Sequence, residues 1–379
     1  MDVLAYFIPG FHNDKFNNEW WGDGFTEWDN IKQSAPLYDG HFQPNKPLDG
    51  FYDLASLDVL ANNFKMAKEF GIDSFIFYDY WYDGKRPLGS VMDLILKNQQ
   101  LDFGFSLCWG NHSWTKSWKN RSGSLDVLIE QTYGDAESIN RQVNFYVNAF
   151  HDPRYYKVDG RPLFQIYRPN DIPNLDLFIS SLVNKCVSSG LKKPYLVANY
   201  SGSKNTSDLL KNFDSLILTN PTLALFSDEN LFSEKKTSQL QNIKDVRNYP
   251  TFLKKLLYRI QDFLPDNHEV FDYSFVNAKL IKQSLSGYNL LGGRLLFSCF
   301  TGFDNTPRYK NRAKIVENTD SAVFSDTLQS LYNINKSAPY IAINAWNEWG
   351  EGMVLEPSTL HGYSFLESIM KFKKTNNLL

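Results

Sequence analysis

Short apolar runs alternate with longer segments of helical periodicity along most of the chain. Runs rich in β-branched and aromatic residues predict buried strands, and apolar residues recurring every three or four positions predict amphipathic helices. We expect strands at Leu4–Ile8, Ser74–Tyr80, Phe103–Trp109, Leu163–Tyr167, Tyr195–Tyr200, Ser215–Thr219, Arg294–Phe300 and Tyr340–Trp346. We expect helices at about Leu54–Phe70, Ser90–Asn98, Ala136–Ala149, Leu175–Ser189, Lys204–Asn212, Tyr273–Leu285, Ala322–Lys336 and His361–Lys373. Such alternation is typical of a parallel sheet covered by helices.

Eight strand-and-helix units favour a closed barrel over an open sheet, because no glycine-rich dinucleotide or phosphate motif is present. The predicted fold class is therefore α/β, a single (β/α)8 TIM barrel over residues 1–379 with elaborated loops at its C-terminal face. Residues 221–272 follow the sixth strand and predict an insertion within this domain. A patch at 252–264, FLKKLLYRIQDFL, predicts a basic amphipathic helix that either packs on the barrel or rests on anionic lipid.

Bulk composition narrows the partners and the compartment. The 379 residues include 39 Lys and Arg against 42 Asp and Glu, so no excess of positive charge attracts nucleic acid. Three cysteines at irregular spacing indicate reduced, buried thiols, not a disulfide framework or a zinc site. The start MDVLAYFIPGFH has no leader-like features, and no apolar run approaches the ~20 residues of a membrane span, so we expect a cytoplasmic protein.

Aromatic and polar residues gather directly after the predicted strands, where barrel enzymes carry their active sites. Aromatic rings stack on sugar faces, and polar groups bond sugar hydroxyls. The alternatives are core packing for the aromatic residues, surface ion pairs for the charged ones and satisfied loop histidines. The expected substrate-binding residues are His12, Trp20, Trp21, Glu27, Trp28, Asp79, Tyr80, Trp81, Lys85, Arg86, Trp109, Asn111, His112, Trp114, Tyr167, Asp304, Asn305, Arg308, Trp346, Asn347 and Trp349.

Two glutamates after the eighth strand are the candidate catalytic residues. Cleaving or forming a glycosidic bond needs a proton donor and a second carboxyl group, and Glu348 and Glu351 supply such a pair in a glycine-flanked turn outside the packed core. Adjacent like charges separate the two pKa values, leaving one acid and one base near neutral pH. The alternative is a solvated helix start whose dipole favours acidic residues. No set of side chains has metal-site spacing, so we expect neither a metal nor a cofactor.

Seven phrases are long enough to carry a family resemblance: EWWGDGFTEWDN, GHFQPNKPLDGFYDL, GIDSFIFYDYWYDGKRPL, LCWGNHSWTKSW, GRPLFQIYRP, GFDNTPR and INAWNEWGEGMVLEP. In this order they resemble the blocks of the WbsX-like proteins, bacterial polysaccharide-biosynthesis proteins with a domain like glycoside hydrolase family 99. The blocks run from Phe7 to Pro357. The stretch from Lys204 to Ser286 carries little of the resemblance.

The resemblance implies a barrel related to the endo-α-mannosidases. In that hydrolase family a phrase like Asn347–Gly352 holds both essential glutamates. Carried over, Glu348 is the base acting on the sugar's own 2-hydroxyl, Glu351 is the acid and then the base at the glycosidic oxygen, and configuration is retained. One position departs from the family pattern, because His112 stands where a glutamate is usual.

The expected function is a retaining glycosyltransferase of bacterial surface-polysaccharide synthesis, for O-antigen or capsule. Its expected partners are a sugar donor and a glycan or lipid-linked oligosaccharide, met through peripheral contact with the inner face of the membrane. An endo-acting retaining α-glycoside hydrolase, endo-α-mannosidase-like, is the alternative. A glycan-binding barrel without catalysis is the third interpretation, favoured only by His112. The sequence leaves the oligomeric state open.

Overall fold

A computed structural model describes residues 1–116, 127–202, 206–227, 232 and 268–379. Its central sheet runs in the order β11-β9-β8-β7-β3-β2-β1-β15-β12, and every neighbouring pair in this order is parallel. The strands are β1 Asp2–Phe7, β2 Ser74–Asp79, β3 Gly104–Trp109, β7 Arg161–Ile166, β8 Tyr195–Tyr200, β9 Ser215–Leu218, β11 Leu295–Leu296, β12 Ser298–Phe300 and β15 Tyr340–Asn344.

The two ends of this order belong to one stretch of chain, so the sheet closes on itself. β11 pairs with β9, and β12, which begins after a single intervening residue, pairs with β15. Together β11 and β12 form the seventh strand predicted from the sequence. The barrel and all eight of its predicted strands are confirmed.

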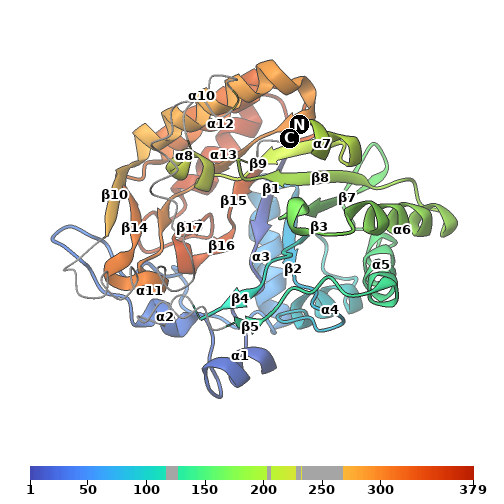
Figure 1. Cartoon of the computed structure of the whole chain (residues 1–379). Helices are drawn as coiled ribbons and strands as arrows, with labels where there is room; N and C mark the ends of the chain where they lie inside the picture. Colours follow the sequence, from blue (N-terminus) through green and yellow to red (C-terminus); the bar gives the residue numbers. More distant parts are fainter. Residues whose placement is uncertain (117–126, 203–205, 228–231, 233–267) are drawn as a thin grey trace, which may run out of the picture.

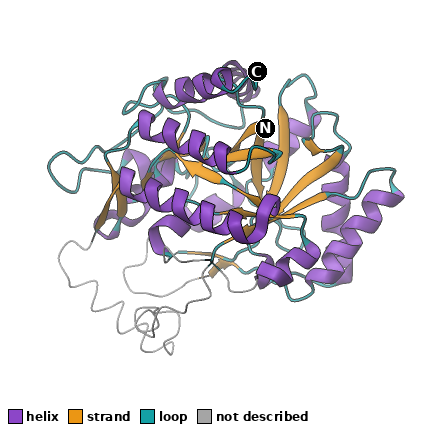
Figure 2. Ribbon diagram, turned by 90° about the horizontal axis from the view of Figure 1, so that it is seen from above, coloured by secondary structure: helices purple, strands orange, loops and turns teal. Residues whose placement is uncertain are grey.

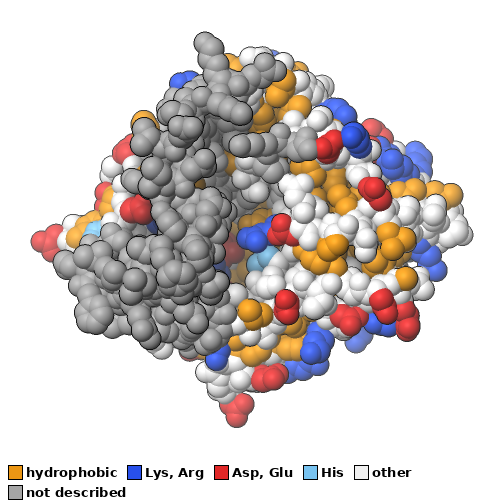
Figure 3. Space-filling view, in the orientation of Figure 1, with side chains coloured by type: hydrophobic (Ala, Val, Ile, Leu, Met, Phe, Trp, Pro, Cys, Tyr) orange, Lys and Arg blue, Asp and Glu red, His pale blue; other side chains and the backbone are white. Residues whose placement is uncertain are grey.

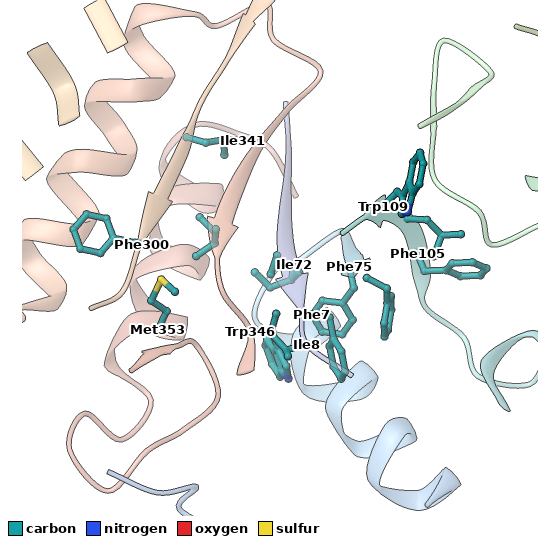
Figure 4. Packing of buried hydrophobic residues seen from close by; sticks show 14 of the residues in the cluster. Phe7, Ile8, Ile72, Phe75, Phe105, Trp109, Phe300, Ile341, Trp346 and Met353 are labelled. Carbon is teal, nitrogen blue, oxygen red and sulfur yellow. The ribbon is translucent and has the colours of Figure 1, made fainter. Parts of the chain in front are cut away.

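Side chains on the barrel strands form two apolar layers. Leu4, Ile76, Leu163 and Ile217 fill the barrel interior, where Gln165 also bonds the hydroxyls of Tyr6 and Tyr340. Alternate residues face outward and pack under the helices, among them Phe7, Phe75, Phe105 and Ile341 (Figure 4). Because both faces of each strand are buried, the strands are largely apolar and show no regular alternation of polar and apolar residues.

Helices lie around the sheet of the barrel (Figure 2). The helices expected from periodicity are α3 Leu57–Glu69, α4 Ser90–Lys97, α5 Ala136–Phe150, α6 Leu175–Ser188, α7 Thr206–Asn212, α10 Tyr273–Leu291, α12 Ser321–Ile334 and α13 Ser364–Thr375. In the described part of the chain, four short helices lie in loops where we expected none: α1 Lys15–Trp21, α2 Trp28–Lys32, α8 Thr222–Phe226 and α11 Thr306–Tyr309. These helices are too short for a periodic pattern to identify them.

The loops that follow the strands gather at one end of the barrel, and both chain termini lie at the other (Figure 1). This loop end carries α1, α2 and α11 together with three small sheets. The sheets are the hairpin β4 Trp114–Thr115 with β5 Val127–Ile129, the hairpin β16 Asn347–Glu348 with β17 Met353–Val354, and the group β10 Glu269–Asp272, β14 Lys314–Glu317 and β13 Phe303–Asp304. A short strand β6 Lys157–Val158 pairs with β7.

Three further expectations concern the cysteines, the insertion and membrane-spanning helices. Cys108, Cys186 and Cys299 are buried and unpaired, as expected. The amphipathic patch at 252–264, and with it most of the expected insertion, lies outside the described residues. Within the described part of the chain, no helix combines the length and apolarity that crossing a membrane requires.

Candidate active site

Three carboxylates from two distant loops meet at the guanidinium of Arg308. Arg308 Nη2 donates to Glu348 Oε1 at 2.8 Å, Nη1 donates to Glu351 Oε1 at 2.8 Å, and Nε donates to Glu27. The side chains of Arg308, Glu27 and Glu348 are 15%, 10% and 11% exposed, whereas that of Glu351 is 30% exposed. A planar guanidinium with donors in a fixed fork suits this arrangement, which a lysine cannot reproduce.

The turn after the eighth strand places both candidate catalytic glutamates beside this arginine. Glu348 ends β16, and Glu351 ends the 3₁₀ turn η6 Trp349–Glu351, which leads into β17. Gly352 closes the turn at φ 69°, in the left-handed region that favours glycine. The glycine-flanked bend expected from the sequence is therefore present, and it turns both carboxylates toward Arg308. Glu348 is buried, however, which corrects the expectation that neither glutamate lies in packed surroundings.

The charges around Arg308 do not cancel, because three carboxylates face one guanidinium. Burial and the neighbouring Glu351 and Glu27 raise the pKa of Glu348 to about 8, against the lowering effect of Arg308. Burial opposes the charge on Arg308 as well, but the three carboxylates raise its pKa above the ordinary value. Near neutral pH, Glu348 in the free protein therefore holds a proton and Arg308 stays charged.

The rings of Tyr80, Trp114 and Trp20 form an aromatic wall next to the carboxylates. The ring of Tyr80 lies 4.7 Å from that of Trp114, which in turn packs edge-on against Trp20 at 5.6 Å. Burial raises the pKa of Tyr80, and the charge of Glu348 acts in the same direction. Burial raises the pKa of Tyr167 too, where Glu351 and Glu348 act in the same direction. The face in Figure 3 is hollowed near its middle, and histidine, basic and acidic side chains gather there beside hydrophobic ones.

His112 sits between Tyr80 and Tyr167, with ring centroids 6.2 and 5.6 Å away. Buried Asn111 fixes its place: Asn111 Nδ2 donates to the Arg168 carbonyl at 2.7 Å and Oδ1 accepts from the Arg168 N–H at 2.7 Å. These two hydrogen bonds between Asn111 and Arg168 hold the turns after β3 and β7 together. Burial and the charge of Arg168 lower the pKa of His112 to about 4, so the imidazole is neutral at physiological pH.

Two tryptophans expected in the cleft belong instead to the outer core. Trp109 is 1% exposed and packs on Phe178 of α6, with ring centroids 4.9 Å apart. Trp346 is fully buried against Phe75, and its Nε1 donates to Asn63 of α3. Figure 4 shows both rings among the hydrophobic residues outside the strands. The prediction that they contact substrate was wrong, because at these positions the strand turns its side chain toward the helices.

A second group of residues expected to bind sugar instead contacts other side chains of the protein beside β2. Buried Asp79 pairs with Arg86 at 3.1 Å and accepts from the Tyr146 hydroxyl at 3.2 Å. Arg86 also pairs with Asp93 and lies over the ring of Phe145, against which Trp81 packs as well. These contacts attach the loop after β2 to α4 and α5, so Asp79, Trp81 and Arg86 stabilise the scaffold.

The remaining corrections concern residues that hold the site's own loops together. Asn347 is fully buried and bonds the backbone of Ile8 with both of its polar atoms, so it joins β16 to the end of β1. Other buried residues bond or pack within the protein: His12 with Ser90, Trp28 with Phe11 and Tyr52, Asn305 with the Lys314 N–H, and Trp349 with Glu356. Glu27 contacts Arg308, not open solvent.

The other expected ligands stay at or near the surface. Lys85 is exposed, whereas Trp21 is half-buried and packs beside Phe25. Asp304 is half-buried and accepts from His41 Nε2 at 2.9 Å and from Gln43. Trp20, Tyr80, His112, Trp114 and Tyr167 are the expected substrate-binding residues whose rings the fold brings into contact with one another, and the charges of the glutamates act on Tyr80 and Tyr167.

Sequence reasoning missed two residues that shape the site. Gly350 approaches Arg308 and Glu27 so closely that a Cβ atom there would lie 2.7 Å and 2.4 Å from them. Buried Glu356 accepts from the Tyr52 hydroxyl at 2.6 Å and from Trp349 Nε1 at 2.7 Å, and burial raises its pKa to about 7. Gly350 was visible between the two glutamates, but only the structure shows what its missing side chain accommodates. Over the described ranges, no three His, Cys, Asp or Glu side chains cluster as a metal site would require.

A closed barrel whose loop end carries paired carboxylates beside aromatic rings is typical of enzymes that act on glycosidic bonds. A family model described as "Glycosyltransferase WbsX" matches residues 3–369, and the chain belongs to this family. The expectation drawn from the seven phrases is thereby confirmed. The chain is a member of a carbohydrate-active enzyme family.

Relatives and solved structures agree with this assignment. Two curated proteins named "Uncharacterized protein WxcX", from two strains of Xanthomonas campestris pv. campestris, are 29% identical over 372 residues, which is 97% of this chain. The chain spans about half the length of these relatives, 48% of each. A GH99 endo-alpha-mannosidase from Bacteroides thetaiotaomicron has the same fold at a TM-score of 0.55 and 12% identity, covering 99% of this chain and 98% of that one. A "Glycoside hydrolase-like protein" matches at a TM-score of 0.59 and 12% identity, covering 98% and 93%.

Proposed function

We propose that the protein is a retaining glycosyltransferase of bacterial surface-polysaccharide synthesis, with Glu348 and Glu351 as its catalytic residues. The observation that carries the proposal is the contact of both carboxylates with the fork of one guanidinium, beside an aromatic wall. Both carboxylates bind the fork of the same arginine, so they lie close enough together to act on one sugar unit.

Within this proposal Glu348 is the base that takes the proton from the sugar 2-hydroxyl. A sugar hydroxyl is a poor acid, so a carboxylate of ordinary pKa is a weak base toward it. Burial of Glu348 raises its pKa from 4.5 to about 8, which makes its carboxylate a stronger base with a pKa near the operating pH. Glu351 is more exposed and protonates the departing glycosidic oxygen while the deprotonated 2-oxygen bonds to the anomeric carbon. Glu351 then takes the proton of the acceptor hydroxyl, which attacks the anomeric carbon and breaks that bond, and Glu348 returns its proton to the 2-oxygen.

The aromatic wall and His112 are the proposed surface for the sugar rings. Trp20, Trp114 and Tyr80 offer apolar faces, and neutral His112 is able to donate to or accept from a hydroxyl. We further propose that the barrel with its insertion is one domain. Its acceptor would be a lipid-linked glycan at the inner face of the membrane.

An endo-acting retaining α-glycoside hydrolase is the second candidate. The barrel shared with the Bacteroides endo-alpha-mannosidase favours it, because the same carboxylate pair serves hydrolysis when water replaces the acceptor hydroxyl. Transfer requires that bound sugar and acceptor keep water out of the cleft. The two candidates therefore differ in what enters after the leaving group departs.

The test incubates purified protein with a lipid-linked glycan and candidate sugar donors, and separately with finished polysaccharide. Glu348→Gln and Glu351→Gln are run beside the wild type, with Glu69→Gln on an exposed part of α3 as the matched control. We expect chain extension in the first mixture, lost in both site variants and kept in the control. Cleavage of polysaccharide with no extension would establish the hydrolase instead, and glycan binding without either reaction would favour a non-catalytic barrel.

A further inference from the structure

We propose that Glu27 and Arg308 are a positioning pair, which holds Glu348 and Glu351 in register and sets the charge state of Glu348. The inference deepens the proposed function and rests on it for the catalytic role of the glutamates. It reassigns Glu27 and Arg308, which sequence reasoning placed among the sugar ligands. Neither residue is proposed to contact the substrate.

Arg308 is anchored at both ends. At the base of its helix α11, Asp304 Oδ1 accepts the Thr306 N–H at 2.9 Å, while Asp304 Oδ2 accepts from His41 Nε2 at 2.9 Å. His41 Nδ1 accepts the Leu37 N–H, so the proton on this imidazole lies on Nε2, facing Asp304. At the other end the guanidinium reaches Glu27, Glu348 and Glu351 through Nε, Nη2 and Nη1. The loop before α2, the turn after β12 and the hairpin after β15 are thereby joined at one group.

Gly350 makes this convergence sterically possible. A Cβ atom at this position would lie 2.4 Å from Glu27 Oε1 and 2.7 Å from Arg308 Nε, far inside contact distance. The peptide between the two catalytic glutamates thus packs directly on the positioning pair. Changing Gly350 to alanine displaces Glu27 and Arg308 without altering any charge.

The charged groups near Glu348 determine whether a substitution at Glu27 or Arg308 raises or lowers the pKa of Glu348. Arg308 on α11 favours its carboxylate form, whereas Glu351 of η6 and Glu27 before α2 favour its protonated form. Tyr80 after β2 and Tyr167 after β7 also lie near Glu348, and both remain neutral because their pKa values are raised. Removing the charge of Glu27 therefore makes Glu348 easier to ionise, and removing that of Arg308 makes it harder. A purely structural role predicts no such opposition.

The experiment titrates the side-chain carboxyl carbons of ¹³C-labelled glutamate by NMR in the full, substrate-free protein. The Glu348 signal is identified by its loss in Glu348→Gln. Since one charge within about 4–6 Å shifts a carboxyl pKa by about 1–3 units, we expect Glu27→Gln to lower the midpoint of Glu348 by about 1 unit and Arg308→Gln to raise it. Exposed Glu69→Gln and half-exposed Arg141→Gln are the matched controls and should leave it unchanged.

Two further variants separate position from charge. Arg308→Lys keeps the charge but loses the fork, so the midpoint should stay near the wild-type value while kcat falls at least about tenfold. Gly350→Ala should lower kcat in the same way with every charge retained. Glu27→Gln and Arg308→Gln should also move the pH dependence of kcat/KM in opposite directions.

If Glu27→Gln and Arg308→Gln both move the Glu348 midpoint in the same direction, or if neither moves it, the proposed positioning pair is overturned. If Arg308→Gln does not fold, a lowered Glu348 midpoint in Glu27→Gln together with an unchanged midpoint in Arg308→Lys supports the pair, and an unchanged midpoint in Glu27→Gln overturns it. Because the NMR titration needs no substrate, the expected midpoints found together with an absence of glycosyl transfer support the pair and count against the proposed function alone.

Discussion

Glu348→Gln should stabilise the folded protein at alkaline pH while removing its activity. In the wild type, burial and the neighbouring carboxylates hold a proton on Glu348 up to about pH 8, whereas the unfolded chain releases it near the ordinary value of 4.5. The folded state therefore binds more protons between these two values, and stability falls as pH rises. Glutamine has the same shape and never ionises, so the variant escapes this loss.

The size of the pKa shift of Glu348 sets the size of the change in unfolding free energy. A displacement of about 3.5 pKa units corresponds to roughly 5 kcal/mol at about 1.4 kcal/mol per unit, of which about 4 kcal/mol falls between pH 5 and pH 9. The glutamine Oε1 still accepts from Arg308 Nη2, so this hydrogen bond adds no pH-dependent difference. The difference in unfolding free energy between variant and wild type should thus grow by about 4 kcal/mol across this range and level off above pH 8.

Urea denaturation followed by tryptophan fluorescence at each pH measures this difference directly. Glu356, whose pKa burial raises to about 7, contributes equally to both proteins and cancels. The exposed Glu19→Gln serves as control, and its difference from wild type should be flat. A Glu348→Gln difference that stays constant within about 1 kcal/mol from pH 5 to 9 would refute the reasoning, because Glu348 would then ionise as in the unfolded chain.

Four further outcomes follow from the site and the core. If Glu348 is the base, wild-type kcat/KM rises with pH and reaches a plateau above about 8, and a fall over this range would assign it the acid role instead. Glu351→Gln should lower kcat by ~10²- to 10⁴-fold with an unchanged melting temperature, so wild-type turnover would remove it from the mechanism. His112→Glu should alter substrate preference or pH dependence more than stability, because it places a charge where a neutral imidazole stands, and identical kinetics from pH 5 to 8 would show a bystander. Trp346→Ala should cost about 3–5 kcal/mol of unfolding free energy by denaturation, since it empties a fully buried site, and a loss below about 1 kcal/mol would contradict the packing described.

Strand and helix patterns were sufficient to predict the barrel, because both signals are local. A buried parallel strand needs only a short run of β-branched and aromatic residues, and an amphipathic helix only its own periodicity. The seven motif phrases likewise lie within short stretches of sequence. The glutamate pair after the eighth strand, three residues apart, was visible for the same reason.

The direction of side chains at the strand ends was not predictable in this way. Barrel strands are buried on both faces, so they carry no alternation of polar and apolar residues to show which side is which. Trp109 faces α6, whereas His112, three residues later, packs between Tyr80 and Tyr167. Such a choice depends on where the strand stops and the loop turns, which the packing of neighbouring helices decides.

The partnership of Arg308 is the clearest case of a feature decided by tertiary structure alone. Arg308 lies 281 residues from Glu27 and 40 from Glu348 along the chain, and no local pattern relates them. Sequence determined that these residues follow the first, seventh and eighth strands. Only closure of the barrel, which brings the eighth strand back beside the first, places their charges within contact of one another.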